Sequence, residues 1–129
     1  MDKKKRVLLI EDDPNTQALY SEVLIDGGFE VTPATDGEVG LTASRKGGFD
    51  LILLDIMLPK LDGLGVLTNL KNQGPVQPNG PIIILTNLSD DALSKQAMDL
   101  GAKGYLIKSD VHTSDLVAKL TGFLDLKGL

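Results

Sequence analysis

The chain has 129 residues, 42% of them hydrophobic and 24% charged, with a formal net charge of −5 at pH 7. This length suits one domain with a core of its own, and the composition is ordinary for a globular protein. The negative charge argues against a general attraction to nucleic acid or anionic membranes. Cysteine is absent, which excludes disulfides, thiolate catalysis and cysteine-based zinc sites.

Other common site types are also not expected. The only histidine is His112, so neither a histidine-rich metal site nor a Ser-His-Asp triad fits the sequence. The single basic run, KKKR at residues 3–6, indicates a solvated lead-in to the first strand. No apolar stretch has the length of a membrane span or of a signal-peptide core, so a cytoplasmic location is the default expectation.

Short apolar runs alternate with helical patterns along the whole chain. The first half predicts strands at 6–10 and 29–35 and helices within 11–28 and 36–48, capped by Asp13 and Asp36. The second half predicts strands at 50–54, 82–85 and 103–107, and helices at 63–72, 89–101 (with Ser89 as cap) and 113–126. Pro33 indicates an edge strand or a strand end. Residues 73–81, dense in glycine and proline, are expected to form a mobile surface loop.

This order of elements predicts one α/β domain over residues 1–129. Five strand–helix units in succession imply a parallel sheet with helices on both faces, that is, a doubly wound (βα)5 fold. The most hydrophobic strand, 50–54, is expected at the centre of the sheet.

Polar residues follow the predicted strands at their carboxyl ends. Because parallel strands all end at the same edge, where open α/β sheets bind ligands, these side chains are expected to lie close together. They are Glu11, Asp12 and Asp13 after the first strand, Asp55 after the third, Thr86 and Asn87 after the fourth, and Lys108 and Ser109 after the fifth.

Such a set of residues predicts a metal-dependent phosphoryl site. Carboxylates from two strand ends repel each other and need a cation, and hard oxygen ligands suit Mg²⁺ or Mn²⁺. A lysine and a hydroxyl beside a metal ion can bind a phosphoryl group and stabilise its transfer. Asp55, which ends the most buried strand, is the best candidate for a nucleophile that forms an acyl phosphate.

Each of these residues alone has an ordinary structural explanation. Asp13 alone is a helix cap, Glu11 or Asp12 a solvated strand end, Thr86 a loop residue and Lys108 a surface lysine. Their joint placement at successive strand ends favours the functional interpretation.

Four motifs in order resemble the receiver domains of bacterial two-component response regulators. They are VLLIEDDP (7–14), DLILLDIMLPKLDG (50–63), IIILTN (82–87) and GAKGYLIKSD (101–110), and the resemblance covers essentially the whole chain. It implies a flavodoxin-like sheet with the strand order 2-1-3-4-5. It also implies a switch in which a histidine kinase or a histidine phosphotransfer protein phosphorylates Asp55.

The resemblance further implies a role for each site residue. Mg²⁺ would bind Asp12, Asp55 and the backbone carbonyl of Met57 directly, and Glu11 through a water molecule. Lys108 would pair with a phosphoryl oxygen. Thr86 would move to hydrogen-bond the phosphoryl group, and Tyr105 would change rotamer with it. The surface formed by the helix at 89–101, the strand at 103–107 and the helix at 113–126 would then change.

The sequence departs from the family pattern in two places. Ser109 follows Lys108, where the family usually has proline after a cis peptide bond, so a trans bond is expected here. Asn87 stands where the family more often has a small residue, and it could touch or narrow the phosphoryl pocket. Met57 and Leu88 would flank the path of water to the acyl phosphate, and since both are apolar, a relatively long-lived phosphoryl state is expected.

The implied partners are a kinase or phosphotransfer protein and a downstream protein or fused output domain. Direct nucleic-acid binding and membrane association are not expected, and a homodimer through the surface described above is possible within the family. Two other functions fit the sequence less well. A phosphatase of the haloacid-dehalogenase type needs a second acid where this chain has Met57. A binding module that is never phosphorylated would not need the complete set of site residues.

Overall fold

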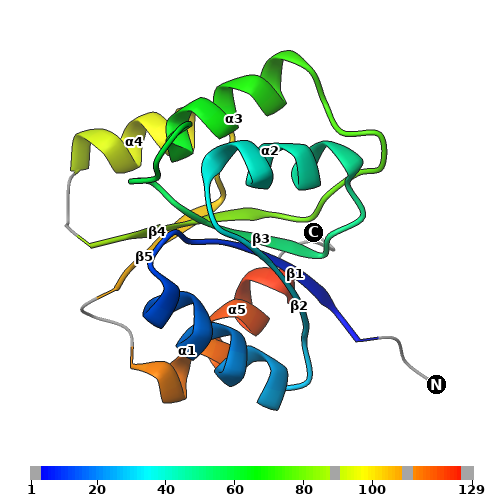
Figure 1. Ribbon diagram of the computed structural model, residues 1–129, viewed down its shortest axis with the longest axis vertical. Helices are drawn as coiled ribbons and strands as arrows, with labels where there is room; N and C mark the ends of the chain where they lie inside the picture. Colours follow the sequence, from blue (N-terminus) through cyan, green and yellow to red (C-terminus); the bar gives the residue numbers. More distant parts are fainter. Residues whose placement is uncertain (1–3, 88–90, 109–111, 126–129) are drawn as a thin grey trace.

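The fold is that of a computed structural model, which describes residues 4–87, 91–108 and 112–125. Strands and helices alternate five times, as the sequence predicts (Figure 1). The strands are β1 (Arg6–Ile10), β2 (Glu30–Ala34), β3 (Leu51–Asp55), β4 (Ile82–Thr86) and β5 (Gly104–Ile107). The helices are α1 (Pro14–Asp26), α2 (Gly37–Lys46), α3 (Gly63–Asn72), α4 (Asp91–Asp99) and α5 (Thr113–Asp125).

All five strands pair in parallel, in the order β2-β1-β3-β4-β5. The predicted doubly wound sheet is therefore confirmed, with β3 at its centre and every residue of β3 buried. The strand that contains Pro33 is an edge strand, which is where proline is tolerated in a sheet.

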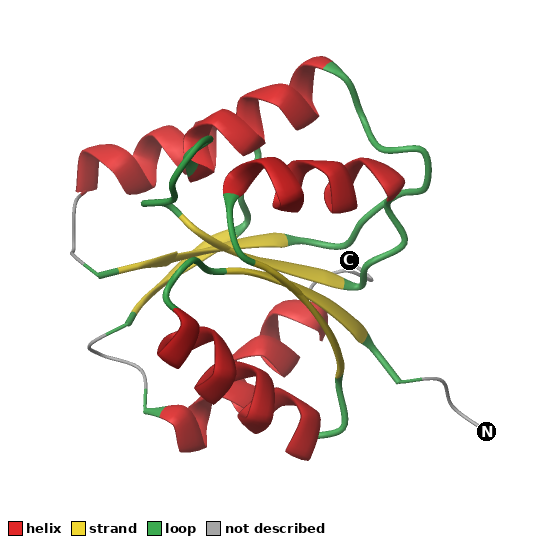
Figure 2. Cartoon of the chain, viewed as in Figure 1, coloured by secondary structure: helices red, strands yellow, loops and turns green. Residues whose placement is uncertain are grey.

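The two faces of the sheet carry separate hydrophobic layers, because successive side chains of a strand point to opposite faces. Leu8 and Ile10 of β1 pack with the core under α2, α3 and α4, whereas Val7 and Leu9 pack with the core over α1 and α5. Figure 2 shows the helices above and below the yellow sheet. Burial on both faces explains why the central strands read as unbroken apolar runs.

Three helices begin after an aspartate that caps them, two of which, Asp13 and Asp36, the sequence predicts. The Asp13, Asp36 and Asp62 carboxylates accept the backbone N–H groups of Thr16, Val39 and Gly65, at 2.9, 2.9 and 2.8 Å. Asp13 is thus a helix cap, as predicted. The predicted cap Ser89 and the peptide bond between Lys108 and Ser109 lie outside the described residues.

The loop over residues 73–81, predicted to be a mobile surface excursion, is hydrogen-bonded to other parts of the chain. Its backbone is tied to the segment between α2 and β3, since the Val76 N–H donates to the Arg45 carbonyl (2.7 Å) and the Gly80 N–H to the Phe49 carbonyl (2.8 Å). The Asn79 side chain adds a bond to the Ser44 carbonyl at 2.9 Å. These partners are distant in sequence, so the local composition gave no sign of them.

Glycine is required where the two loops meet. Gly47 has a φ of 78°, and a Cβ there would lie 1.7 Å from the Gln77 carbonyl oxygen. We expect Gly47→Ala to lower the free energy of unfolding by about 2 kcal/mol or more, because both the backbone conformation and the contact oppose a side chain. Gly74→Ala, in open space in the loop over residues 73–81, should change the free energy of unfolding by less than about 0.5 kcal/mol. Urea unfolding measures both, and equal effects would contradict the assigned loop contact.

Among the described helices, none combines the length and the apolar character needed to cross a bilayer.

Candidate functional site

The predicted site residues meet at the carboxyl edge of the sheet. Glu11 directly follows β1, Asp55 is the last residue of β3, Thr86 is the last residue of β4 and Lys108 directly follows β5. Because β1, β3, β4 and β5 are adjacent, their ends deliver these side chains to one place.

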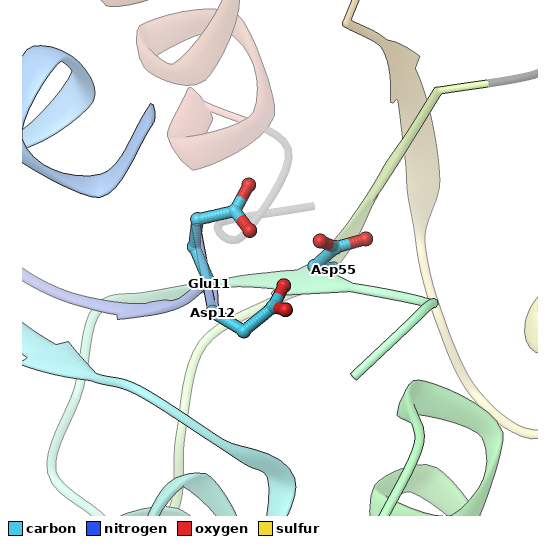
Figure 3. A group of neighbouring side chains, drawn as sticks. All are labelled: Glu11, Asp12 and Asp55. Carbon is cyan, nitrogen blue, oxygen red and sulfur yellow. The ribbon is translucent and has the colours of Figure 1, made fainter. Parts of the chain in front are cut away.

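Three carboxylates form a compact cluster at this edge. One oxygen from each of Glu11, Asp12 and Asp55 lies within 4.8 Å of the other two. Figure 3 shows the three groups turned toward a common space, two of them from the end of β1 and one from the end of β3. Glu11 is fully buried and Asp55 is 3% exposed, whereas Asp12 is exposed to solvent. The donor set consists of hard oxygens and fits Mg²⁺ or Mn²⁺.

Lys108 is the counter-ion of the two buried acids. Its ammonium donates to the Asp55 carboxylate at 3.1 Å and to the Glu11 carboxylate in a closer contact. The second oxygen of Glu11 accepts the Asp13 backbone N–H at 3.1 Å. Buried charges that are paired and hydrogen-bonded in this way are tolerated in a protein interior, whereas unpaired ones are not.

The ion pairs raise the pKa of Lys108. Burial alone would lower this pKa, but the hydrogen bonds and charges of Glu11 and Asp55 outweigh it. The lysine therefore stays charged at neutral pH and supplies a fixed positive charge beside Asp55.

The residues that the resemblance assigns to switching lie on β4 and β5. Thr86 is 5% exposed, and its backbone carbonyl accepts the Lys108 N–H at 2.7 Å. Tyr105 pairs with Ile84 in the sheet, and 45% of its surface is exposed. Asn87, which directly follows β4, is exposed.

The segment after Asp55 lies over the same edge. The Met57 backbone N–H donates to Asp55 Oδ1 at 3.2 Å, and the Met57 side chain is largely exposed. Leu88, predicted to flank the pocket together with Met57, lies outside the described residues.

Two residues near the site were missed by the sequence reasoning. The Gln17 side-chain amide donates to the backbone carbonyls of Glu11 (3.0 Å) and Ala34 (3.2 Å) and so joins the ends of β1 and β2. Tyr20 is buried beneath the edge, and burial raises its pKa. Both lie on α1, and the sequence predicts this helix but not which of its residues reach the edge of the sheet.

Comparison with known proteins agrees with the fold. The family model described as "Response regulator receiver domain" matches residues 7–121. The chain is 34% identical over 120 residues to the transcriptional regulatory protein PcoR of Escherichia coli, covering 93% of this chain and 51% of PcoR. It is 37% identical over 115 residues to the transcriptional regulatory protein DltR of Streptococcus agalactiae, covering 89% of this chain and 50% of DltR. The chain thus spans about half the length of these relatives.

Solved structures show the same architecture. A CheY-like response regulator receiver domain protein from Methanospirillum hungatei superposes with a TM-score of 0.86 at 28% identity, with 98% of each chain covered. A structure described as the BeF3-activated DrrB receiver domain gives a TM-score of 0.79 at 28% identity, over 95% of this chain and 99% of that one. With the family model, the relatives and the shared strand order in agreement, this chain belongs to the response regulator receiver domain family.

Proposed function

We propose that the domain is a phosphorylation-dependent signalling switch whose phosphoacceptor is Asp55. The observation that carries this proposal is the Lys108 ammonium placed between two buried carboxylates, one of which ends the central strand. Asp12 completes an acidic cluster suited to a divalent cation.

The proposed reaction is a phosphoryl transfer from a phosphohistidine of a kinase or phosphotransfer protein. An Asp55 carboxylate oxygen attacks phosphorus, an acyl phosphate bond forms, and the N–P bond breaks with its electron pair left on the imidazole. Bound at Asp12, Asp55 and the Met57 carbonyl, with Glu11 acting through water, Mg²⁺ would offset the negative charge of the phosphoryl oxygens. Lys108, already 3.1 Å from Asp55, would pair with one of those oxygens.

The proposed output is a change of surface. Thr86 would hydrogen-bond the phosphoryl group, and Tyr105, now 45% exposed, would change rotamer with it. The surface of α4, β5 and α5 would then bind a downstream protein, an output domain or a second copy of the chain. A new dianionic group can bias such a two-state element.

The test is intact-mass spectrometry after incubation with acetyl phosphate. With Mg²⁺ the protein should gain one phosphoryl group, and with EDTA in place of Mg²⁺ the gain should be lost. No gain under either condition would instead favour a binding module that is not phosphorylated. Continuous turnover of acetyl phosphate with no stable adduct would favour a phosphatase.

The lifetime of the phosphoryl group depends on the side chain at Met57. This side chain is apolar and 68% exposed, so it cannot orient a water molecule for attack on the acyl phosphate. We expect Met57→Glu to speed dephosphorylation about tenfold, a barrier change of about 1.4 kcal/mol. Loss of the phosphoryl mass after removal of acetyl phosphate gives the rate. Val76→Glu, at an exposed apolar residue in the loop over 73–81, serves as control. An unchanged rate in Met57→Glu would refute this role.

A further inference from the structure

The loop between β3 and α3, residues 56–62, is held against the start of α2. Gly37, the first residue of α2, lies so close that a Cβ there would sit 1.6 Å from the Leu61 carbonyl oxygen. Beside it, the Lys60 ammonium lies 3.5 Å from Asp36 Oδ2. The N-cap of α2 and the first residue of α2 thus lie against two neighbouring residues of this loop.

The same loop has a strained backbone. Within the described residues, Lys60 is the one non-glycine residue with a positive φ, 68°. Around it the Leu61 N–H donates to the Pro59 carbonyl at 2.7 Å, which closes a tight three-residue turn of the rare positive-φ kind. Such a conformation persists only where surrounding contacts hold it, and it clusters at functional sites.

The loop leads directly to the acidic cluster. Its second residue, Met57, donates its backbone N–H to Asp55 Oδ1 at 3.2 Å. A bond from the Gly63 N–H to the Ile56 carbonyl, at 2.9 Å, closes the loop at its base. A shift at Lys60 or Leu61 would therefore move the Met57 backbone and the carboxylate that it contacts.

We propose that Asp36, Gly37 and Lys60 are positioning residues that hold this loop in the conformation needed to bind the divalent cation. The inference rests on the proposed metal site and assigns to that site residues 36, 37 and 60, which lie outside the acidic cluster. Gly37, which has no side chain, lets the Leu61 carbonyl approach α2 closely. The ion pair between Asp36 and Lys60 holds the turn against the start of α2.

The two oxygens of Asp36 have separate tasks, which makes the ion pair testable. Oδ1 accepts the Val39 N–H and caps α2, whereas Oδ2 faces Lys60. Asn is as good a cap as Asp, so Asp36→Asn removes the ionic partner and keeps the cap. Asn also tolerates the left-handed backbone at position 60, so Lys60→Asn removes the positively charged side chain without straining the turn further. Lys60→Arg keeps a positively charged side chain.

The experiment is a titration with Mg²⁺ in which the backbone amide NMR shifts of Asp55 and Met57 report binding. Asp36→Asn and Lys60→Asn should each weaken binding about two- to fivefold, the range of an exposed ion pair, and Lys60→Arg should bind like the wild type. If Lys60 acted on the metal site only through its positive charge, its removal would tighten Mg²⁺ binding. Weakening in Lys60→Asn therefore identifies positioning, and unchanged or tighter binding would overturn it.

Gly37→Ala tests the contact between α2 and this loop with a larger expected effect on Mg²⁺ binding. We expect it to weaken Mg²⁺ binding about tenfold or more, because the Leu61 carbonyl must move. The control is Gly122→Ala on α5, where a Cβ meets nothing within 4 Å. If Gly37→Ala fails to fold, Lys60→Asn decides, because its effect through space alone would have the opposite sign.

The outcomes separate this inference from the metal site itself. No Mg²⁺-dependent shift in the wild type would overturn the proposed site. Binding in the wild type that is equally strong in Asp36→Asn, Lys60→Asn and any folded Gly37→Ala would overturn the positioning role alone.

Discussion

Asp55→Asn should abolish phosphorylation and leave the fold in place. Asn has the same shape, so the central strand keeps its packing, but the amide lacks the nucleophilic oxygen anion. The initial rate of phosphoryl gain from acetyl phosphate should fall at least about a hundredfold. Circular dichroism and thermal melting should match the wild type closely, since Lys108 keeps its contact with Glu11.

Asp26→Asn is the matched control for this variant. Asp26 is an exposed aspartate at the end of α1, so its loss should change neither the phosphorylation rate nor the melting temperature. Phosphorylation of Asp55→Asn at the wild-type rate would show that another residue accepts the phosphoryl group.

Lys108→Met should lower both stability and phosphorylation. The variant leaves the fully buried Glu11 and the nearly buried Asp55 without their shared cation, and we expect a loss of about 2–3 kcal/mol in the free energy of unfolding. Phosphorylation should slow by at least about tenfold, because no ammonium remains to meet the phosphoryl oxygens. Mg²⁺ binding should persist and tighten, since a competing positive charge has gone.

Lys103→Met is the control, because Lys103 is an exposed lysine that directly precedes β5. Urea unfolding and a Mg²⁺ titration measure the two effects. Wild-type stability in Lys108→Met would contradict the ion pairs described for this site.

The pH dependence of the same comparison follows from the raised pKa of Lys108. A lysine whose pKa is higher in the folded than in the unfolded state contributes its full stability below the unfolded pKa, about 10.4. That contribution disappears as the pH rises through the folded pKa. The difference in unfolding free energy between wild type and Lys108→Met should therefore be constant from neutral pH to about pH 10 and shrink above it.

Much of the fold followed from the sequence because its signals are local. The apolar run at 82–85 and the helical pattern at 63–72 match β4 (Ile82–Thr86) and α3 (Gly63–Asn72) closely. The parallel arrangement then placed Asp55 and Lys108 at one edge without any knowledge of their contacts. The order of the elements and the polar residues at the strand ends were sufficient to predict the fold and the edge at which these residues meet.

The parts that escaped prediction depend on contacts between distant residues. Lys108 and Glu11 are 97 positions apart, and their ion pair could not be inferred from either segment. The sequence also could not tell that Glu11 is buried while Asp12 is exposed, since that depends on how the chain leaves β1. Likewise, the positive φ of Lys60 has no local signal, because Lys rarely adopts it.

The most direct test of the central claim is to trap the acyl phosphate and locate it. Borohydride reduces an aspartyl phosphate to homoserine, so the protein is treated with acetyl phosphate and Mg²⁺, reduced, digested and mapped by mass spectrometry. The proposed function predicts homoserine at position 55 and at no other aspartate. Homoserine at position 12 or 13, or none at all after Mg²⁺ binding has been verified, would contradict it.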